Sequence, residues 1–203
     1  RKRKARMTCA KKGWDPSGRA QVFLLHPFRQ SLRVVVLAQS TDNRNRRTYA
    51  RKLMELILWR HAEAEATSPD MARIVTKKGR NQAARMADWL NPRLPQQVRI
   101  LMSPATRTMQ TAQALGRTCE QVAALAPGGT VDDVLAATGW PDADGCVVVV
   151  GHQPTLGQVA VRLLTGQGGD IAFRKGGIWW FQSRIRQGET QVLLKAVVSP
   201  DWL

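Results

Sequence analysis

The stretch Leu56-Ile57-Leu58-Trp59-Arg60-His61 decides how the chain is interpreted. Its apolar residues predict a short buried strand over residues 55–59. The strand ends abruptly in a cation and an imidazole. Ligands of open α/β sheets bind beyond the carboxyl ends of the strands. Arg60-His61 is therefore a candidate anion-binding turn, although an Arg-His pair alone is weak evidence.

Two later segments repeat this pattern of a strand followed by a polar turn and a helix. The strand predicted over Val98–Met102 leads into Ser103-Pro104, which predicts an N-cap with proline at the first helical position. Arg107 falls in the first turn of that helix. The run Cys146–Val150 is apolar and β-branched, as a central parallel strand requires, and leads into Gly151-His152.

The spacing of apolar residues predicts what separates and follows these strands. Thr76 is a candidate cap for a helix that Asn91-Pro92 ends. Two segments near the C-terminus, Gly177–Arg184 and Thr190–Val198, flank a turn at Gln187-Gly188 and predict an antiparallel hairpin. Further elements are expected at Gln121–Leu125 (strand), Val131–Ala137 (helix) and after Pro154 (a helix burying Leu156, Val159, Ala160, Leu163 and Leu164). This alternation predicts an α/β three-layer sandwich with a mostly parallel sheet and an antiparallel C-terminal edge hairpin.

Charge divides the chain into two parts. Residues 1–53 hold 15 of the 31 Lys and Arg residues and two acidic residues, a net charge of +13. Residues 54–203 have a net charge of only +3. We therefore expect a basic N-terminal extension over 1–53 and one domain over 54–203. The extension has four interpretations: a weakly ordered tail, a stretch upstream of the true start at Met54, a nucleic-acid or acidic-surface tail, or a targeting peptide.

Composition also limits the compartment and the cofactors. The three cysteines, Cys9, Cys119 and Cys146, lack the spacing of a metal site, and their odd number favours a reducing, cytoplasmic compartment. No apolar run reaches the roughly 18 residues that span a bilayer, so we expect no membrane partner. The sequence predicts neither a metal nor another cofactor.

The polar groups of the three turns should meet if their strands are parallel neighbours. Each group alone has an ordinary explanation, since a histidine at a strand end usually packs or caps and a helical arginine is usually solvated. Together, two arginines and two imidazoles would repel one another without an anion between them. A guanidinium fork suits phosphate oxygens, and a helix N-terminus favours negative charge. The cluster therefore predicts a phosphate site.

Three motifs give the chain a resemblance to a known family. Arg60-His61 after a strand, the element Ser103–Ala112 and Gly151-His152 resemble the histidine phosphatase superfamily, with its phosphoglycerate mutase-like fold. The helix start Thr76-x-x-Gly79-x-x-Gln82-Ala83 also fits. The resemblance covers about 54–203. Only 45 residues separate Arg107 from His152, too few for a sizeable lid, and this favours the small SixA-type phosphohistidine phosphatases.

The resemblance implies the roles of the site residues. His61 would be the nucleophile, and Arg60, Arg107 and His152 would bind the phosphate oxygens. Position 62 holds Ala where the superfamily usually has Gly. The general acid is open: Glu63 and Asp132 are the candidate proton donors, with Asp133 beside the latter, and none stands in a strong motif. Because a phosphohistidine releases an imidazole whose conjugate acid has a pKa of ~6.5, it needs little help from an acid.

These arguments favour a phosphatase that acts on phosphohistidine in a protein partner. A phosphatase for small phosphate esters with the same site is the alternative enzyme. An alternative of a different class is a basic protein that binds nucleic acid or a partner through residues 1–53, and nucleic acid is expected only there.

Overall fold

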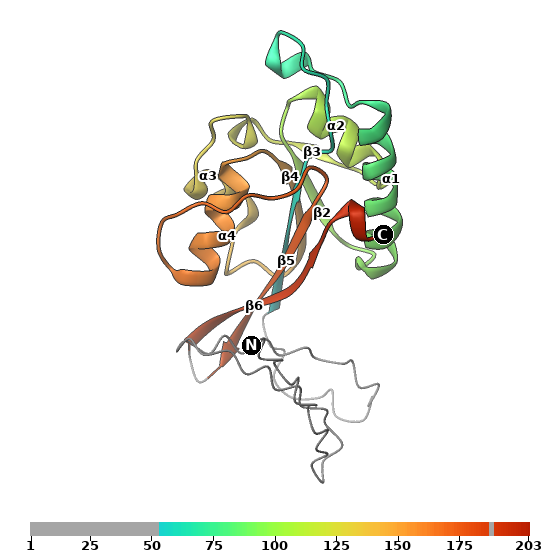
Figure 1. The fold of residues 1–203 in the computed structure, drawn as a ribbon. Helices are drawn as coiled ribbons and strands as arrows, with labels where there is room; N and C mark the ends of the chain where they lie inside the picture. Colours follow the sequence, from blue (N-terminus) through green and yellow to red (C-terminus); the bar gives the residue numbers. More distant parts are fainter. Residues whose placement is uncertain (1–52, 187–188) are drawn as a thin grey trace, which may run out of the picture. The chain divides into compact units, whose positions relative to one another are not determined.

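The computed structural model describes residues 53–186 and 189–203 (Figure 1). The basic extension predicted over 1–53 therefore lies outside the described residues except for Leu53, and so does the turn predicted at Gln187-Gly188. Within the described residues, no helix is both long and apolar enough to cross a membrane.

A mixed sheet of six strands forms the centre of the described fold, in the order β3-β2-β4-β1-β5-β6. Strands β1, β2, β3 and β4 are parallel to one another, while β5 is antiparallel to β1 and to β6. This confirms the mostly parallel sheet with an antiparallel hairpin at its edge. The strands are β1 (Leu53–Arg60), β2 (Arg99–Met102), β3 (Glu120–Gln121), β4 (Gly145–Gly151), β5 (Ile178–Arg186) and β6 (Glu189–Val198).

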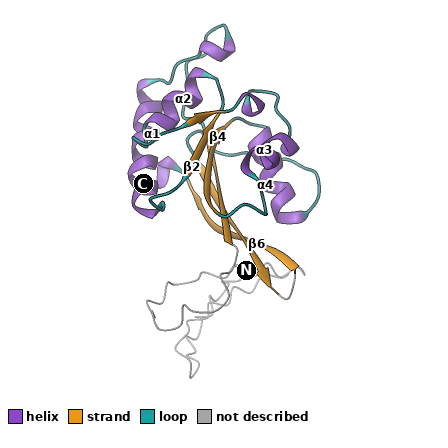
Figure 2. Ribbon diagram, turned by 180° about the vertical axis from the view of Figure 1, so that it is seen from behind, coloured by secondary structure: helices purple, strands orange, loops and turns teal. Residues whose placement is uncertain are grey.

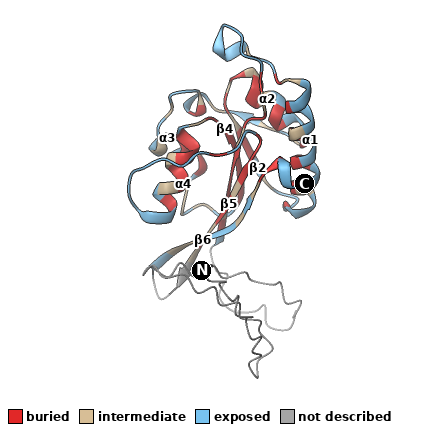
Figure 3. Cartoon of the chain, viewed as in Figure 1, coloured by how far each residue is buried: buried red, intermediate tan, exposed pale blue. Residues whose placement is uncertain are grey.

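Four helices cover the two faces of the sheet and complete the three layers (Figures 1 and 2). Side chains of successive strand residues point to opposite faces. On β1, Leu56 and Leu58 pack in the cluster with α3 and α4, whereas Ile57 and Trp59 pack in the cluster with α1 and α2. Burial is concentrated along the strands between the layers (Figure 3). The helices are α1 (Lys77–Leu90), α2 (Thr106–Gln113), α3 (Val131–Thr138) and α4 (Thr155–Thr165).

Local signals set several helix ends as predicted. The Thr76 hydroxyl accepts a hydrogen bond from the Gly79 N–H and caps α1, which ends at Leu90 before the Asn91–Arg93 3₁₀ helix. At the end of α3, Gly139 has a φ of 74°, a left-handed conformation that favours glycine. Short 3₁₀ helices occur at Asp70–Ala72, Asn91–Arg93, Ala123–Leu125 and Pro200–Trp202.

Three local predictions were wrong. Ser103 is not the N-cap of α2, which begins at Thr106 with Ala105 as its N-cap; the Ser103 hydroxyl accepts from the Ala105 N–H and also contacts His152. The strand expected over Gln121–Leu125 is limited to β3, and residues 123–125 turn as a 3₁₀ helix. Leu164, expected to face the core, is 46% exposed on α4.

Gly79 provides a test of the packing between α1 and the loop that follows β1. A Cβ atom at this position would lie 2.0 Å from the Glu63 carbonyl oxygen and 2.6 Å from a Val75 methyl group. We expect Gly79→Ala to lower the free energy of unfolding in urea by about 1–3 kcal/mol, because backbone must shift to relieve the overlap. Gly168→Ala is the matched control, since nothing lies within 4 Å of its Cβ position. Equal stability of the two variants would contradict this packing.

Candidate active site

The carboxyl ends of β1, β2 and β4 lie side by side at one edge of the sheet. The His61 N–H donates to the Gly151 carbonyl oxygen at 3.1 Å, and the Ser103 N–H donates to the Val150 carbonyl oxygen at 3.1 Å. These backbone bonds continue the strand pairing into the turns. They bring together the three turns as the sequence predicted.

His61 is buried, and its backbone surroundings define its tautomer. Its Nδ1 lies 2.7 Å from the Ala62 carbonyl oxygen. A carbonyl oxygen only accepts, so Nδ1 carries the hydrogen and Nε2 carries the lone pair. The Thr111 hydroxyl accepts from the Ala62 N–H at 3.0 Å, which ties this turn to α2. The basic nitrogen of His61 is therefore Nε2.

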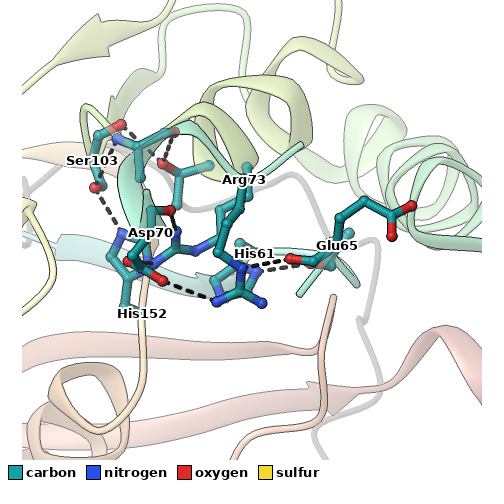
Figure 4. A network of polar contacts seen from close by, with 10 residues as sticks. His61, Glu65, Asp70, Arg73, Ser103 and His152 are labelled. Atoms are coloured by element: carbon teal, nitrogen blue, oxygen red, sulfur yellow. Dashed lines mark hydrogen bonds and ion pairs between the residues drawn. The ribbon is translucent and has the colours of Figure 1, made fainter. Parts of the chain in front are cut away.

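His152 and Arg107 lie against each other beside His61. The ring centroids of His61 and His152 are 5.3 Å apart. The Arg107 Nη2 atom lies 3.3 Å from His152 Nδ1. The other ring nitrogen, His152 Nε2, lies 2.7 Å from the Ser103 hydroxyl (Figure 4). A guanidinium cannot accept, so in this arrangement His152 Nδ1 is the acceptor and Nε2 carries the hydrogen toward Ser103.

Two buried guanidinium nitrogens have hydrogen-bonding capacity to spare. Arg60 donates from Nη1 to the Phe173 carbonyl oxygen, and Arg107 is 4% exposed. Within residues 53–186 and 189–203, the Nε atoms of both arginines are buried without a hydrogen-bond partner. Leaving a buried donor unpaired costs about 1–3 kcal/mol, and more when the group is charged.

Burial and positive charge keep both imidazoles neutral. Burial lowers the pKa of His61 to about 4; the bond to the Ala62 carbonyl opposes this shift and the neighbouring arginines add to it. Burial also lowers the pKa of His152 to about 3, with His61 and Arg107 acting in the same direction. At pH 7 both rings are therefore uncharged, and the formal positive charge lies on the arginines.

Two of the three motifs, Arg60-His61 and Ser103–Ala112, fall within a match to a known family. The model of the histidine phosphatase superfamily (branch 1) matches residues 56–128. An uncharacterised protein of Picosynechococcus sp. is 35% identical in an alignment of 164 residues that covers 74% of this chain and 99% of the relative. The chain belongs to the histidine phosphatase superfamily. Its class of activity is accordingly that of a phosphatase.

Other histidine phosphatases agree with this assignment. The phosphohistidine phosphatase SixA of Escherichia coli is 28% identical in an alignment of 123 residues that covers 56% of this chain and 76% of the relative. A solved structure described as a phosphohistidine phosphatase SixA of Nakamurella multipartitia has a TM-score of 0.60 at 27% identity. The alignment covers 73% of this chain and 96% of that one. The predicted phosphoglycerate mutase-like fold is thereby confirmed.

Ala62, which departs from the usual glycine of the superfamily, has a packing explanation. It is fully buried and forms a small apolar cluster with Val75 and Ala83. Its methyl group therefore fills space between the His61 turn and the start of α1. The substitution is accommodated behind the turn by apolar contacts.

The candidate proton donors Glu63 and Asp132 are not buried as the two histidines are. The Glu63 carboxylate lies 3.4 Å from Lys78 Nζ at the start of α1. Asp132 is exposed in the first turn of α3. The neighbouring Asp133 forms a capping box with Thr130 and is thereby engaged. The structure brings none of the three into hydrogen-bond contact with His61, Arg107 or His152.

Asp70 lies against the site and was not predicted from the sequence. The Asp70 carboxylate bonds to Arg107 and to Arg73, and the Arg73 side chain also donates to the Glu65 carbonyl oxygen (Figure 4). Asp70 lies in a loop without periodicity, so no sequence pattern indicated it. Ser103 was noticed, but as a helix cap. In the described part of the chain, no cluster of His, Cys, Asp and Glu has the composition of a metal site.

The lowered pKa values predict an unusual titration. We expect the ring signals of His61 and His152 to show NMR titration midpoints near pH 4 and pH 3, because burial opposes the charged form. Both rings should thus remain neutral when an ordinary imidazole, with a pKa near 6.5, takes up its proton. The chain has three histidines, so single His→Gln variants assign the signals. A midpoint near 6.5 for either ring would contradict the electrostatic description of the site.

Proposed function

We propose that the protein hydrolyses phosphohistidine in a protein partner, through a phosphohistidine intermediate on His61. The supporting observation is the environment of His61 Nε2. This nitrogen carries the lone pair of a neutral, buried ring, and Arg107 and His152 lie beside that ring. The similarity to SixA of Escherichia coli, named a phosphohistidine phosphatase, supports the substrate class.

The first step transfers the phosphoryl group to the enzyme. The substrate's phosphorylated ring carries a hydrogen on its other nitrogen. His61 Nε2 attacks phosphorus in line, the bond from phosphorus to that ring breaks, and the ring leaves as a neutral imidazole with the electron pair of the broken bond. Arg60, Arg107 and His152 bind the three equatorial oxygens in this proposal. For His152 this requires the other tautomer, in which Nδ1 donates to the phosphate in place of its contact with Arg107, and Nε2 accepts from the Ser103 hydroxyl. The unpartnered Nε donors of the two arginines support it, because an oxyanion supplies the missing acceptors.

The second step regenerates the enzyme. Water attacks phosphorus, the bond between phosphorus and His61 Nε2 breaks, and inorganic phosphate forms. The Ala62 carbonyl oxygen accepts from Nδ1 throughout, so the ring stays oriented while its other nitrogen carries the phosphoryl group. This contact also stabilises the positive charge that the ring acquires during attack, because a carbonyl dipole points its negative end at the Nδ1 hydrogen.

The state of the nearby carboxylates favours a phosphorus–nitrogen bond over an ester. A phosphate ester expels an alkoxide and gains much from a proton donor, whereas an imidazole leaves readily. Glu63 is paired with Lys78. Hydrogen bonds from Arg73 and Arg107 lower the pKa of Asp70, so its carboxylate is ionised and carries no proton to give at pH 7. Asp132 remains a candidate donor only if substrate binding brings it nearer.

The lack of a sizeable lid between Arg107 and His152 is consistent with a phosphate displayed on a protein. The segment between Arg107 and His152 supplies the rest of α2, then β3, α3 and β4. Val134 of α3 packs with Leu156 and Val159 of α4 in the outer layer. This segment therefore builds a layer of the sandwich, which supports the expectation that it forms no sizeable lid.

Trapping the intermediate tests the nucleophile. Incubation with a protein that carries radiolabelled phosphohistidine should label the enzyme on His61 alone, and His61→Ala should show neither label nor turnover. His26→Ala, a change of the third histidine, serves as the control and should label normally. Label on His152, or unimpaired turnover by His61→Ala, would refute the assignment. Good turnover of small phosphate esters, with none of phosphohistidine, would instead favour the small-molecule phosphatase.

Arg107 tests the role of the guanidinium fork. We expect Arg107→Lys to lower kcat/KM by about 10²–10³-fold and Arg107→Ala by at least as much with some residual activity, because a transition-state donor is lost. Lysine keeps the charge but presents it as a single point. Arg85→Lys on the exposed face of α1 is the control and should keep full activity. A kcat/KM within twofold of the parent for Arg107→Lys would argue against bidentate phosphate binding.

A further inference from the structure

The guanidinium of Arg107 is already bound to an anion of the protein itself. Arg107 Nη2 donates to Asp70 Oδ2 at 2.9 Å, and Arg107 Nη1 donates to the Asp70 carbonyl oxygen at 2.6 Å. The Arg107 side chain is 5% exposed, whereas that of Asp70 is 54% exposed. Asp70 therefore reaches a buried cation from the solvent side, the direction from which a substrate arrives.

The Asp70 carboxylate spans two arginines, as a phosphate group would. Its Oδ1 accepts from Arg73 Nη1 at 3.0 Å, and its Oδ2 accepts from Arg107. Carboxylate and phosphate oxygens are the two anions that arginine forks bind in the same manner. The negative charge of the carboxylate also acts to raise the pKa of His152, against the larger effect of burial.

The segment that carries Asp70 is held mainly by polar contacts. At its base, Ala64 and Val75 form a β-bridge, and the Glu65 N–H donates to the Ile74 carbonyl oxygen at 2.8 Å. Beyond that base, the 3₁₀ turn Asp70–Ala72 has no buried residue, and Met71 and Ile74 are 40% and 50% exposed. Few apolar contacts thus oppose movement of the turn, and the bonds of Asp70 are its chief connection to the site.

We infer that Asp70 is a specificity-determining residue whose carboxylate competes with the phosphoryl group for Arg107. This inference rests on the proposed function, because it assigns Arg107 to phosphate. A free phosphate or a small ester has only its own oxygens with which to displace the carboxylate. A phosphoryl group on a protein brings further contacts along the rim, where Met71 and Ile74 are exposed. Displacement also frees Arg73 Nη1 to meet the incoming anion.

Removal of the Asp70 charge tests this competition. Asp70→Asn keeps the size of the side chain and the backbone carbonyl that Arg107 contacts. We expect it to lower the Kd for inorganic phosphate, measured by titration calorimetry, by about tenfold, as loss of one competing charge-assisted bond predicts. The KM for p-nitrophenyl phosphate should fall with it, while kcat does not rise. A structural role alone would not tighten phosphate binding.

Glu65→Gln is the matched control for charge. It removes the same charge from the same segment, and the Glu65 contact with Arg73 is made by the backbone oxygen, which this change retains. Its Kd for phosphate should stay within twofold of the parent. If Glu65→Gln and Asp70→Asn tighten binding equally, the effect is general electrostatics and the inference is wrong. Unchanged or weaker phosphate binding by Asp70→Asn would also overturn it.

The binding measurement separates this inference from the proposed function. Phosphate affinity does not require turnover, so an enzyme inactive on phosphohistidine would refute the function while the effect of Asp70→Asn could still be read. The single variant Arg107→Ala and the double variant Arg107→Ala with Asp70→Asn should both bind phosphate weakly. If Asp70→Asn tightens phosphate binding equally with and without Arg107, the carboxylate does not compete at that guanidinium, and the inference fails.

Discussion

Desolvation of two imidazoles beside two arginines is the constraint on which the described structure depends. His61 and His152 lie 5.3 Å apart with Arg107 in contact with His152, and burial holds both rings neutral. Had the rings carried charge, four cations would share one corner of the sheet at a high electrostatic cost. Neutral rings remove two of those four charges and leave a single repelling pair. They also leave His61 as a nucleophile, since only the uncharged imidazole has a lone pair to donate.

The parallel register supplies the geometry that this constraint needs. Strands β1 and β4 pair directly, so His61 and His152 follow equivalent positions, Arg60 and Gly151. One backbone carbonyl and one hydroxyl then fix the tautomers. The Ala62 carbonyl oxygen accepts a hydrogen bond from His61 Nδ1, and the Ser103 hydroxyl accepts one from His152 Nε2. The fold thus orients one nitrogen on each ring. Because both rings follow paired strands of one sheet, they are held more rigidly than two separate loops would hold them.

Periodic elements were predictable from the sequence, and contacts between loops were not. The run at Cys146–Val150 can bury both faces only as a central strand, and α1 follows its apolar spacing from Thr76 to Leu90. The four residues proposed for phosphate binding and attack stand at the ends of such elements. Predicting parallel neighbouring strands therefore also predicted that these residues meet. Ser103 was misjudged because its hydroxyl contacts His152, which lies 49 residues away and which no local pattern connects to it.

Asp70 shows why such distant contacts also change the chemistry of the site. It lies 37 residues before Arg107, in a loop whose path is set by the Ala64–Val75 bridge and not by any repeat of its own. Without it, the guanidinium of Arg107 would be a buried cation with no counter-charge among its contacts. With it, the resting site holds an internal anion of one charge at the place proposed for a phosphoryl group. A phosphoryl group carries more charge and more acceptor oxygens than a carboxylate, so exchange can favour the substrate while the empty site stays compensated. The Asp70 carboxylate then binds Arg107 again when phosphate leaves. The site can therefore stabilise a bound phosphoryl group strongly and still release inorganic phosphate.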